Sequence, residues 1–262
     1  MKYLWQVYKL CIKNDILSQI SYKRDFVLQL IVWSIYTCLP FLSIVLLIEN
    51  FGDIHGYTTY HIAIFYGVVT ISYDFARMVA RGFDNFSALL ISGDLDIFFI
   101  RPQPILIQVF GSSVFLRRLS GILQGLVILI GGLIPYGVDV CLWIAVLLIM
   151  SATIVLYIAL LIIYSAICFY TIKDNLFSEL VIDTSVSLSY YPMEAFKKPL
   201  RSIFTYIIPV ACCIYYPLQQ MLLNAHIAWH RIAFSWFCAG SMLIISILLF
   251  HCGLRKYKSV NN

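Results

Sequence analysis

The 262-residue chain is 61% hydrophobic and only 12% charged, whereas a soluble domain has about 25% charged residues. This composition excludes an ordinary soluble domain, and the net charge of +5, carried by basic residues scattered between apolar runs, argues against a nucleic-acid-binding surface. A lipid-embedded protein remains, because a helix needs roughly 20 apolar residues to cross the hydrocarbon and several stretches reach that length.

The first 25 residues predict an amphipathic helix that lies along the membrane surface. Lys2, Gln6, Lys9 and Lys13 recur at steps of three or four residues and form one polar, basic face, while apolar side chains fill the other. This pattern is typical of interfacial helices. It does not resemble a short, cleavable signal peptide, so we expect the segment to be retained.

The rest of the chain predicts an all-α membrane protein with six transmembrane helices in one domain, residues 1–262. Five spans follow from apolar length alone. They are expected over residues 26–48, 57–80, 119–134, 142–172 and 232–254.

Basic residues set the expected orientation of these spans. The loops 49–56 and 135–141 contain no Lys or Arg, whereas the N-terminal segment, the loop 81–118 and the C-terminal tail are basic. Because basic loops stay on the cytoplasmic side, we expect both termini to be cytoplasmic.

Two segments compete for the remaining span. Residues 174–191 include Glu179 and Asp183, whereas residues 200–223 are more apolar but contain Pro209 and Pro217. Hydropathy alone favours the second segment. Either choice gives an even number of spans and leaves both termini on one side.

Four ionisable residues fall within expected spans and are candidate intramembrane polar sites. Asp74 and Arg77 lie three residues apart on one face of the second span. Their position near its end favours an interfacial or structural pair over a transport site. Glu179 and Asp183 lie in the polar candidate for the fifth span.

Motifs of catalysis and of cofactor binding are missing from the sequence. It has no glycine-rich phosphate loop, GxSxG or HExxH stretch. His226 and His230 have a spacing that could hold a metal, but an interfacial pair is the simpler interpretation. We therefore expect no catalytic residue, metal or cofactor on this chain.

The stretch GDLDIFFIRPQP, residues 93–104, interrupts the long loop between the second and third spans. A glycine and carboxylates suit the start of a helix, and an apolar block follows them. Each proline removes a backbone donor and restricts the residue before it. This sequence therefore predicts a short interfacial helix, a break, and an amphipathic segment that leads into the next span.

This element resembles the G-x-L-D-x-x-L-x-R-P loop of bacterial ABC type-2 exporter permeases, six-span membrane subunits encoded separately from their ATPase. A second element, YYPMEAFKKPLRSIFTYIIPVACCIYYP at residues 190–217, is similar to that family's order of Tyr-Pro, Pro-Leu, Ile-Pro and a final Pro. Together with the N-terminal helix and the spans, the resemblance covers almost the whole chain.

The resemblance implies a role for each region. The N-terminal helix would be the interfacial elbow, and residues 174–191 the fifth span. A cytoplasmic coupling helix and its exit would contain Gly93, Asp94, Leu95, Asp96, Arg101 and Pro102. An external re-entrant hairpin at 194–225 would be built around Tyr191, Pro192, Pro199, Pro209 and Pro217.

The function implied is that of a permease of an ATP-driven exporter in the bacterial cytoplasmic membrane. Its partners would be ABC ATPase subunits, which carry ATP and Mg, a second permease, either the same chain or a paralogue, and the surrounding lipid. The alternative from another class is an ion-gradient-driven secondary transporter or channel that uses Asp74, Glu179 and Asp183. Neither reading identifies the cargo.

Overall fold

The structure, a computed structural model, describes residues 17–52, 56–137, 139–171, 177–223 and 227–257. Within these ranges every regular element is a helix, and five helical segments are long and apolar enough to cross a membrane. Their helices are α2 (Lys23–Phe51), α3 (Thr59–Val79), α8 (Leu119–Leu133), α9 (Val140–Thr171) and α13 (Trp229–Lys256). The expectation of an all-helical, multi-pass membrane protein is confirmed.

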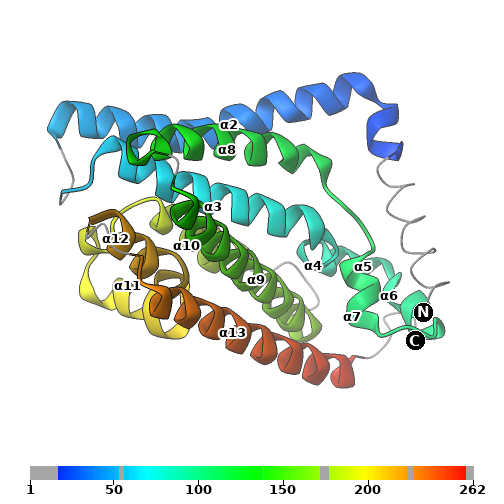
Figure 1. Ribbon diagram of the computed structural model, residues 1–262. Coiled ribbons are helices and arrows are strands. Elements are labelled where there is room, and N and C mark those ends of the chain that lie inside the picture. The colour runs from blue at the N-terminus through cyan, green and yellow to red at the C-terminus, as the bar shows by residue number, and fades with distance from the viewer. Residues whose placement is uncertain (1–16, 53–55, 138, 172–176, 224–226, 258–262) are drawn as a thin grey trace.

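Helix α3 is the centre of the arrangement, with α8 and α9 packed against it. Helix α2 lies outside α8, and α13 packs along α9 (Figure 1). Four short helices gather at one end of the molecule (Figure 1). They are α4 (Arg81–Asp84), α5 (Phe86–Ser92), α6 (Leu95–Ile100) and α7 (Ile105–Phe110).

Only part of the predicted N-terminal helix is described, because residues 1–16 lie outside the described ranges. Residues 17–21 are helical, and the chain bends at Tyr22 before α2 begins. The side-chain amide of Gln19 donates to the Val114 carbonyl at 2.6 Å and accepts from the Leu116 N–H at 3.2 Å. These bonds hold the segment before α2 against the loop that leads into α8.

A bent helical pair occupies the proline-rich region. The segments Lys198–Ile207, which begins with α11 (Lys198–Ser202), and Ala211–Leu223, which ends with α12 (Tyr216–Leu223), meet at an angle of 82°. The break contains Pro209, and Ile208 before it is extended, with φ −116° and ψ 91°, as expected for a residue that precedes proline. A bent pair of this kind is either a broken span or a re-entrant loop.

The competing segment contains a π-helical turn, Ser178–Asp183, followed by α10 (Thr184–Ser189). Its described apolar helix, Leu180–Ser189, is shorter than the roughly 20 residues of a straight span. Residues 172–176 lie outside the described part of the chain. The identity of the fifth span therefore stays a prediction.

Glycines let α3 and α8 approach closely. A Cβ atom built on Gly67 would lie 2.6 Å from the Cβ of Leu129, and one on Gly125 would lie 2.8 Å from Ile71 Cγ1. Small residues at helix contacts provide this close packing in membranes, where lipid competes with apolar side chains. The close contact between α3 and α8 therefore depends on the absence of a side chain at these glycine positions.

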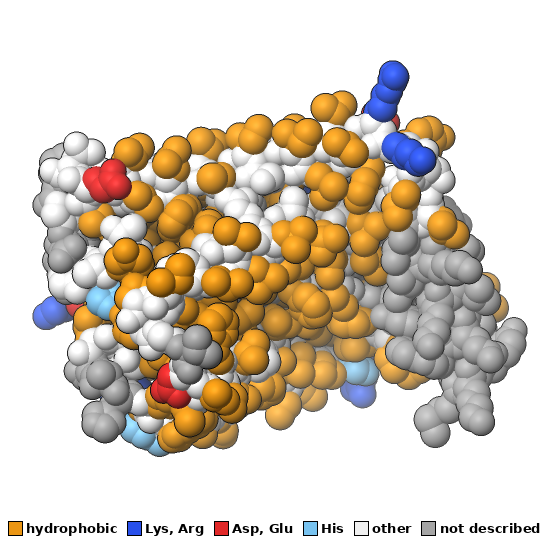
Figure 2. Space-filling view, turned by 45° about the horizontal axis from the view of Figure 1, so that its top comes forward, with side chains coloured by type: hydrophobic (Ala, Val, Ile, Leu, Met, Phe, Trp, Pro, Cys, Tyr) orange, Lys and Arg blue, Asp and Glu red, His pale blue; other side chains and the backbone are white. Residues whose placement is uncertain are grey.

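Large apolar side chains cover much of the outer surface. Figure 2 shows them across most of the visible face, with charged side chains towards its margins. Exposed examples occur on α2, α8, α9 and α13: Leu28, Val32, Ile35, Leu39, Leu123, Val127, Ile144, Leu147, Phe237, Ile244 and Leu248. Such a surface is suited to contact with hydrocarbon.

We predict that Gly132→Leu destabilises the protein and that Gly131→Leu, at the neighbouring position, does not. A Cβ at Gly132 would lie 2.9 Å from Ile64 Cγ1, whereas one at Gly131 meets no atom of the described residues within 4 Å. Overpacking a tight contact costs about 1–3 kcal/mol. Thermal unfolding in detergent should separate the two variants, and equal melting temperatures would contradict the packing of α3 on α8.

Candidate functional site

Helix α6 is short because its sequence defines both ends. Gly93 ends α5 in the left-handed conformation, with φ 76°, which glycine adopts without steric cost. The Ser92 hydroxyl donates to Asp94 Oδ2 at 2.7 Å beside the start of α6. At the other end Arg101 is extended, with φ −83° and ψ 142°, because Pro102 follows it.

The two sides of α6 differ in burial. Leu95 is fully buried and anchors the helix, whereas Ile97 and Phe99 are each 48% exposed and Ile100 is 84% exposed. Asp94 and Arg101, at the two ends of the helix, are also exposed. The structure thus presents a small apolar surface with an acid at one end and a base at the other.

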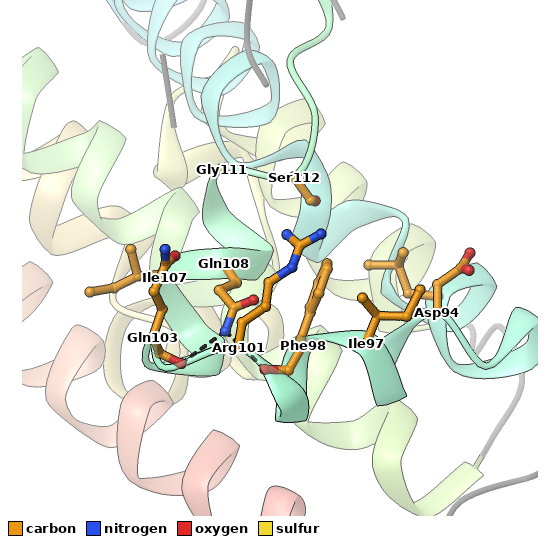
Figure 3. A pocket seen from close by; sticks show the side chains of 10 residues that line it. Asp94, Ile97, Phe98, Arg101, Gln103, Ile107, Gln108, Gly111 and Ser112 are labelled. Atoms are coloured by element: carbon orange, nitrogen blue, oxygen red, sulfur yellow. Dashed lines mark hydrogen bonds between the residues drawn. The ribbon is translucent and has the colours of Figure 1, made fainter. Parts of the chain in front are cut away.

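A hollow of about 450 Å³ separates α6 from α7 (Figure 3). The Gln108 amide donates to the carbonyls of Phe98 at 2.9 Å and Gln103 at 2.8 Å, which joins α6, the following turn and α7. The guanidinium of Arg101 lies 5.8 Å from the ring centre of Phe98, beside the hollow. Arg101 is therefore accessible at the edge of a supported concave surface.

Tyr257, just after α13, ties α6 to the last span. Its hydroxyl donates to Asp96 Oδ1 at 3.0 Å, and its ring stacks on Phe99 with centroids 5.6 Å apart. The same ring meets the edge of Phe169, on α9, at 6.1 Å. Burial, and then the hydrogen bond to Asp96, raise the pKa of Tyr257 to about 12, so the hydroxyl stays a donor at physiological pH.

No motif in the sequence pointed to Tyr257. The hydrogen bond joins positions 161 residues apart, and only the return of α13 to the end where α6 lies makes the contact. The predicted loop residues Asp96 and Arg101 differ in their surroundings. Asp96 is bonded to Tyr257, whereas Arg101 is exposed.

The intramembrane polar residues form a cluster with a different pairing from the one expected. Asp74 forms a salt bridge with Arg118 at 2.8 Å, and both side chains are buried. The Trp33 indole N–H donates to the second oxygen of Asp74 at 3.3 Å, and the Arg118 guanidinium lies 3.9 Å from the Trp33 ring centre. The sequence predicted a pair between Asp74 and Arg77 on one helix. In the structure Asp74 instead pairs with Arg118, which belongs to another span.

Arg77 instead pairs with Asp84 at 3.4 Å and with Asp183 at 3.5 Å. Asp183 also accepts a hydrogen bond from the Tyr73 hydroxyl at 2.5 Å. Asp74 and Asp183 line a hollow of about 80 Å³ between α2, α3 and α10. The side chain of Glu179 lies outside the described part of the structure.

These contacts give each described carboxylate of the cluster a cationic partner. A buried charge is costly unless it is paired and hydrogen-bonded. The carboxylate of Asp74 meets both conditions, because it binds Arg118 in the turn before α8 and Trp33 on α2. Arg77 links α3 to Asp84 on α4 and to Asp183 just before α10. The interpretation of Asp74 and Arg77 as structural residues is therefore favoured, although their partners lie on other elements.

The residues of the expected re-entrant region lie within and before the bent pair. Tyr191 packs edge-on against Phe196 at 6.3 Å, and Pro192 precedes a 3-10 turn. Pro199 lies in the first turn of α11, where its missing N–H costs nothing. Pro209 lies at the break and Pro217 is buried in α12.

A polar contact joins this region to α3. Glu194 accepts hydrogen bonds from the hydroxyl of Tyr215 and from the Gln219 amide, the latter at 3.0 Å. The Tyr215 hydroxyl also lies 3.0 Å from the hydroxyl of Tyr57, just before α3. The bent pair is thus held to the central span at the end of the molecule away from α6 (Figure 1).

Within the described residues no three His, Cys, Asp or Glu side chains are placed to hold a metal ion. Of the two histidines at metal-ligand spacing, His230 is exposed and His226 lies outside the described residues.

The long apolar helices and their exposed apolar faces define a multi-pass helical membrane protein. A family model described as "ABC-2 family transporter protein" matches residues 34–261, and the chain therefore belongs to the ABC-2 family of transporter proteins. No curated protein and no solved structure matches it. Membership makes the chain a membrane component of ABC transport and implies association with ABC ATPase components.

We predict that Arg118→Met destabilises the protein by about 3–5 kcal/mol, because it leaves the buried carboxylate of Asp74 without its cation. The double variant Asp74→Asn/Arg118→Met should recover much of the loss. Arg24→Gln, which removes an exposed base, is the control and should change the melting temperature little. A double variant that is less stable than Arg118→Met would contradict the pairing.

Proposed function

We propose that the chain is the permease subunit of an ATP-driven exporter and forms a translocation pathway with a second permease, either another copy or a paralogue. Separate ATPase subunits bind ATP and Mg and dock on the end that carries α6. Membership of the ABC-2 family supports the class, and the exposed apolar surface of α6 supports the docking site.

In this mechanism α6 is the coupling helix. Closure of two ATPase subunits around ATP moves the surface groove that holds α6, and the helix moves with the groove. Ile97, Phe99 and Ile100 supply apolar contact area. The exposed charges of Asp94 and Arg101 orient the helix in the groove.

Two contacts provide a path for this movement into the membrane. Tyr257 joins α6 to the end of α13 and meets Phe169 on α9. Gln108 joins the end of α6 to α7. Because packed elements move as units, displacement of α6 reaches the last span and α9 together.

The charge distribution supports a cytoplasmic position for this end. Arg255 and Lys256 lie in the last turn of α13, near Tyr257 and α6, and Arg81, Arg101 and Arg117 belong to the same loop region. Basic residues mark cytoplasmic segments. The bent pair at the other end is then external. Lys197, just before it, and Lys198 and Arg201 within it are exceptions to this rule.

The ion-gradient alternative receives less support. A carboxylate that carries a proton or cation across the membrane must exchange partners, and such sites lie along a water-filled route. Asp74 is fully buried and bonded to Arg118 and Trp33, while Asp183 is bonded to Arg77 and Tyr73. We therefore do not propose this function.

The first test is recovery of partners. The tagged chain, solubilised in mild detergent, should co-purify with an ATPase, with or without a second six-span protein, and mass spectrometry identifies both. Recovery of the chain alone, with transport that persists without ATP and stops when the proton gradient is removed, would overturn the proposal.

We predict that Ile100→Glu weakens ATPase binding at least about tenfold, because docking would bury an unpaired charge. Ile100 is 84% exposed, so the substitution should not unfold the chain. Ile134→Glu is the matched control: Ile134 is 72% exposed and begins the 3-10 turn Ile134–Tyr136 after α8, at the opposite end. The measurement is the amount of ATPase recovered per permease, and equal recovery with both variants would contradict docking at α6.

A further inference from the structure

An apolar groove runs between α7 and α13 on the outside of the molecule. Its volume is about 460 Å³. Helix α7 supplies Ile105, Leu106 and Ile107, and α13 supplies Ile247, Phe250 and Leu254. Ile107 is 53% exposed, so the groove opens outwards and is not part of the core.

The position of the groove along α13 matches the depth of a lipid's upper acyl chain. Helix α13 has 28 residues, and a rise of about 1.5 Å per residue makes it longer than the roughly 30 Å of hydrocarbon. Its last turn, with Arg255 and Lys256, therefore reaches the level of the headgroups. The apolar groove residues Ile247, Phe250 and Leu254 lie just beneath that level.

A basic side chain, Arg255, lies near the groove in the sequence of α13. His251 lines it and Arg255 follows one helical turn later on an adjoining face, and both are exposed. No carboxylate occurs among the described residues that line the groove. Lys256, by contrast, points towards α9, with its ammonium nitrogen 5.2 Å from the ring centre of Tyr170. By helical periodicity Arg255, four residues after His251, is on the groove side of α13. Lys256 is not.

We propose that the groove between α7 and α13 binds an anionic phospholipid, with an acyl chain against the apolar side chains and the phosphate beside Arg255. Charge complementarity selects the occupant, because a basic rim at headgroup level attracts anionic lipid over zwitterionic lipid. The inference requires a membrane and holds whether or not an ATPase binds α6.

The bound lipid lies next to α6. Gln103 lines both this groove and the hollow beside α6, and its carbonyl accepts from the Gln108 amide at 2.8 Å. A lipid wedged against α7 would therefore fix the turn that positions α6. Anionic lipid content becomes a condition for the correct placement of that helix.

Native mass spectrometry of the detergent-purified chain tests the site, with phosphatidylglycerol and phosphatidylcholine as the added probes. We expect selective retention of phosphatidylglycerol and about fivefold weaker retention in Arg255→Gln, the effect of one basic side chain at an anionic lipid surface. Lys256→Gln removes the neighbouring charge on the other face and should retain the lipid. Ile107→Trp fills the groove at an exposed position and should also displace it.

Two results would overturn the proposal. One is equal retention of both lipids by the unmodified chain, which indicates only a general coat of lipid. The other is an equal loss of phosphatidylglycerol in Arg255→Gln and Lys256→Gln, which indicates attraction by net charge without a site.

Discussion

The salt bridge between Asp74 and Arg118 fixes how the first three membrane helices meet. Its two charges come from α3 and from the turn that begins α8, and Trp33 of α2 donates to the same carboxylate. A Cβ at Gly121 would lie 1.8 Å from an oxygen of Asp74, so the carboxylate occupies the space that a side chain would take. The salt bridge therefore depends on the glycine at position 121, because a larger residue there would displace the carboxylate of Asp74.

Much of the fold could be predicted because lipid imposes strong and simple limits on sequence. Residues 26–48 and 232–254 are long apolar runs, and only a helix satisfies its own backbone hydrogen bonds in hydrocarbon. The break at Pro209 was likewise visible, because proline removes a donor wherever it occurs. The ion-pair partners of the buried charges could not be predicted from the sequence. Asp74 and Arg77 share a helical face, but their bonds go to Arg118, Asp84 and Asp183, which only the tertiary arrangement brings near.

In the candidate docking site, too, features set by neighbouring residues could be predicted and contacts with distant residues could not. The short length of α6 and its charged ends follow from Gly93, Asp94 and Pro102, which act on their own neighbourhood. The contacts that support α6 do not follow from these residues, since Gln108 comes from the next helix and Tyr257 from the end of the last span. The residues within and next to α6 determine its length and its ends. Contacts with residues distant in the sequence hold the helix in place.

The bond between Tyr257 and Asp96 also has a consequence for the order of synthesis. A chain made from its N-terminus produces α6 long before the residue that holds it, because 161 positions separate the two partners. A nascent or truncated chain that lacks Tyr257 has α6 without this support. A firmly held α6 therefore indicates that the last span has been made and has returned to its place, so finished chains differ from unfinished ones at the surface that we propose for docking.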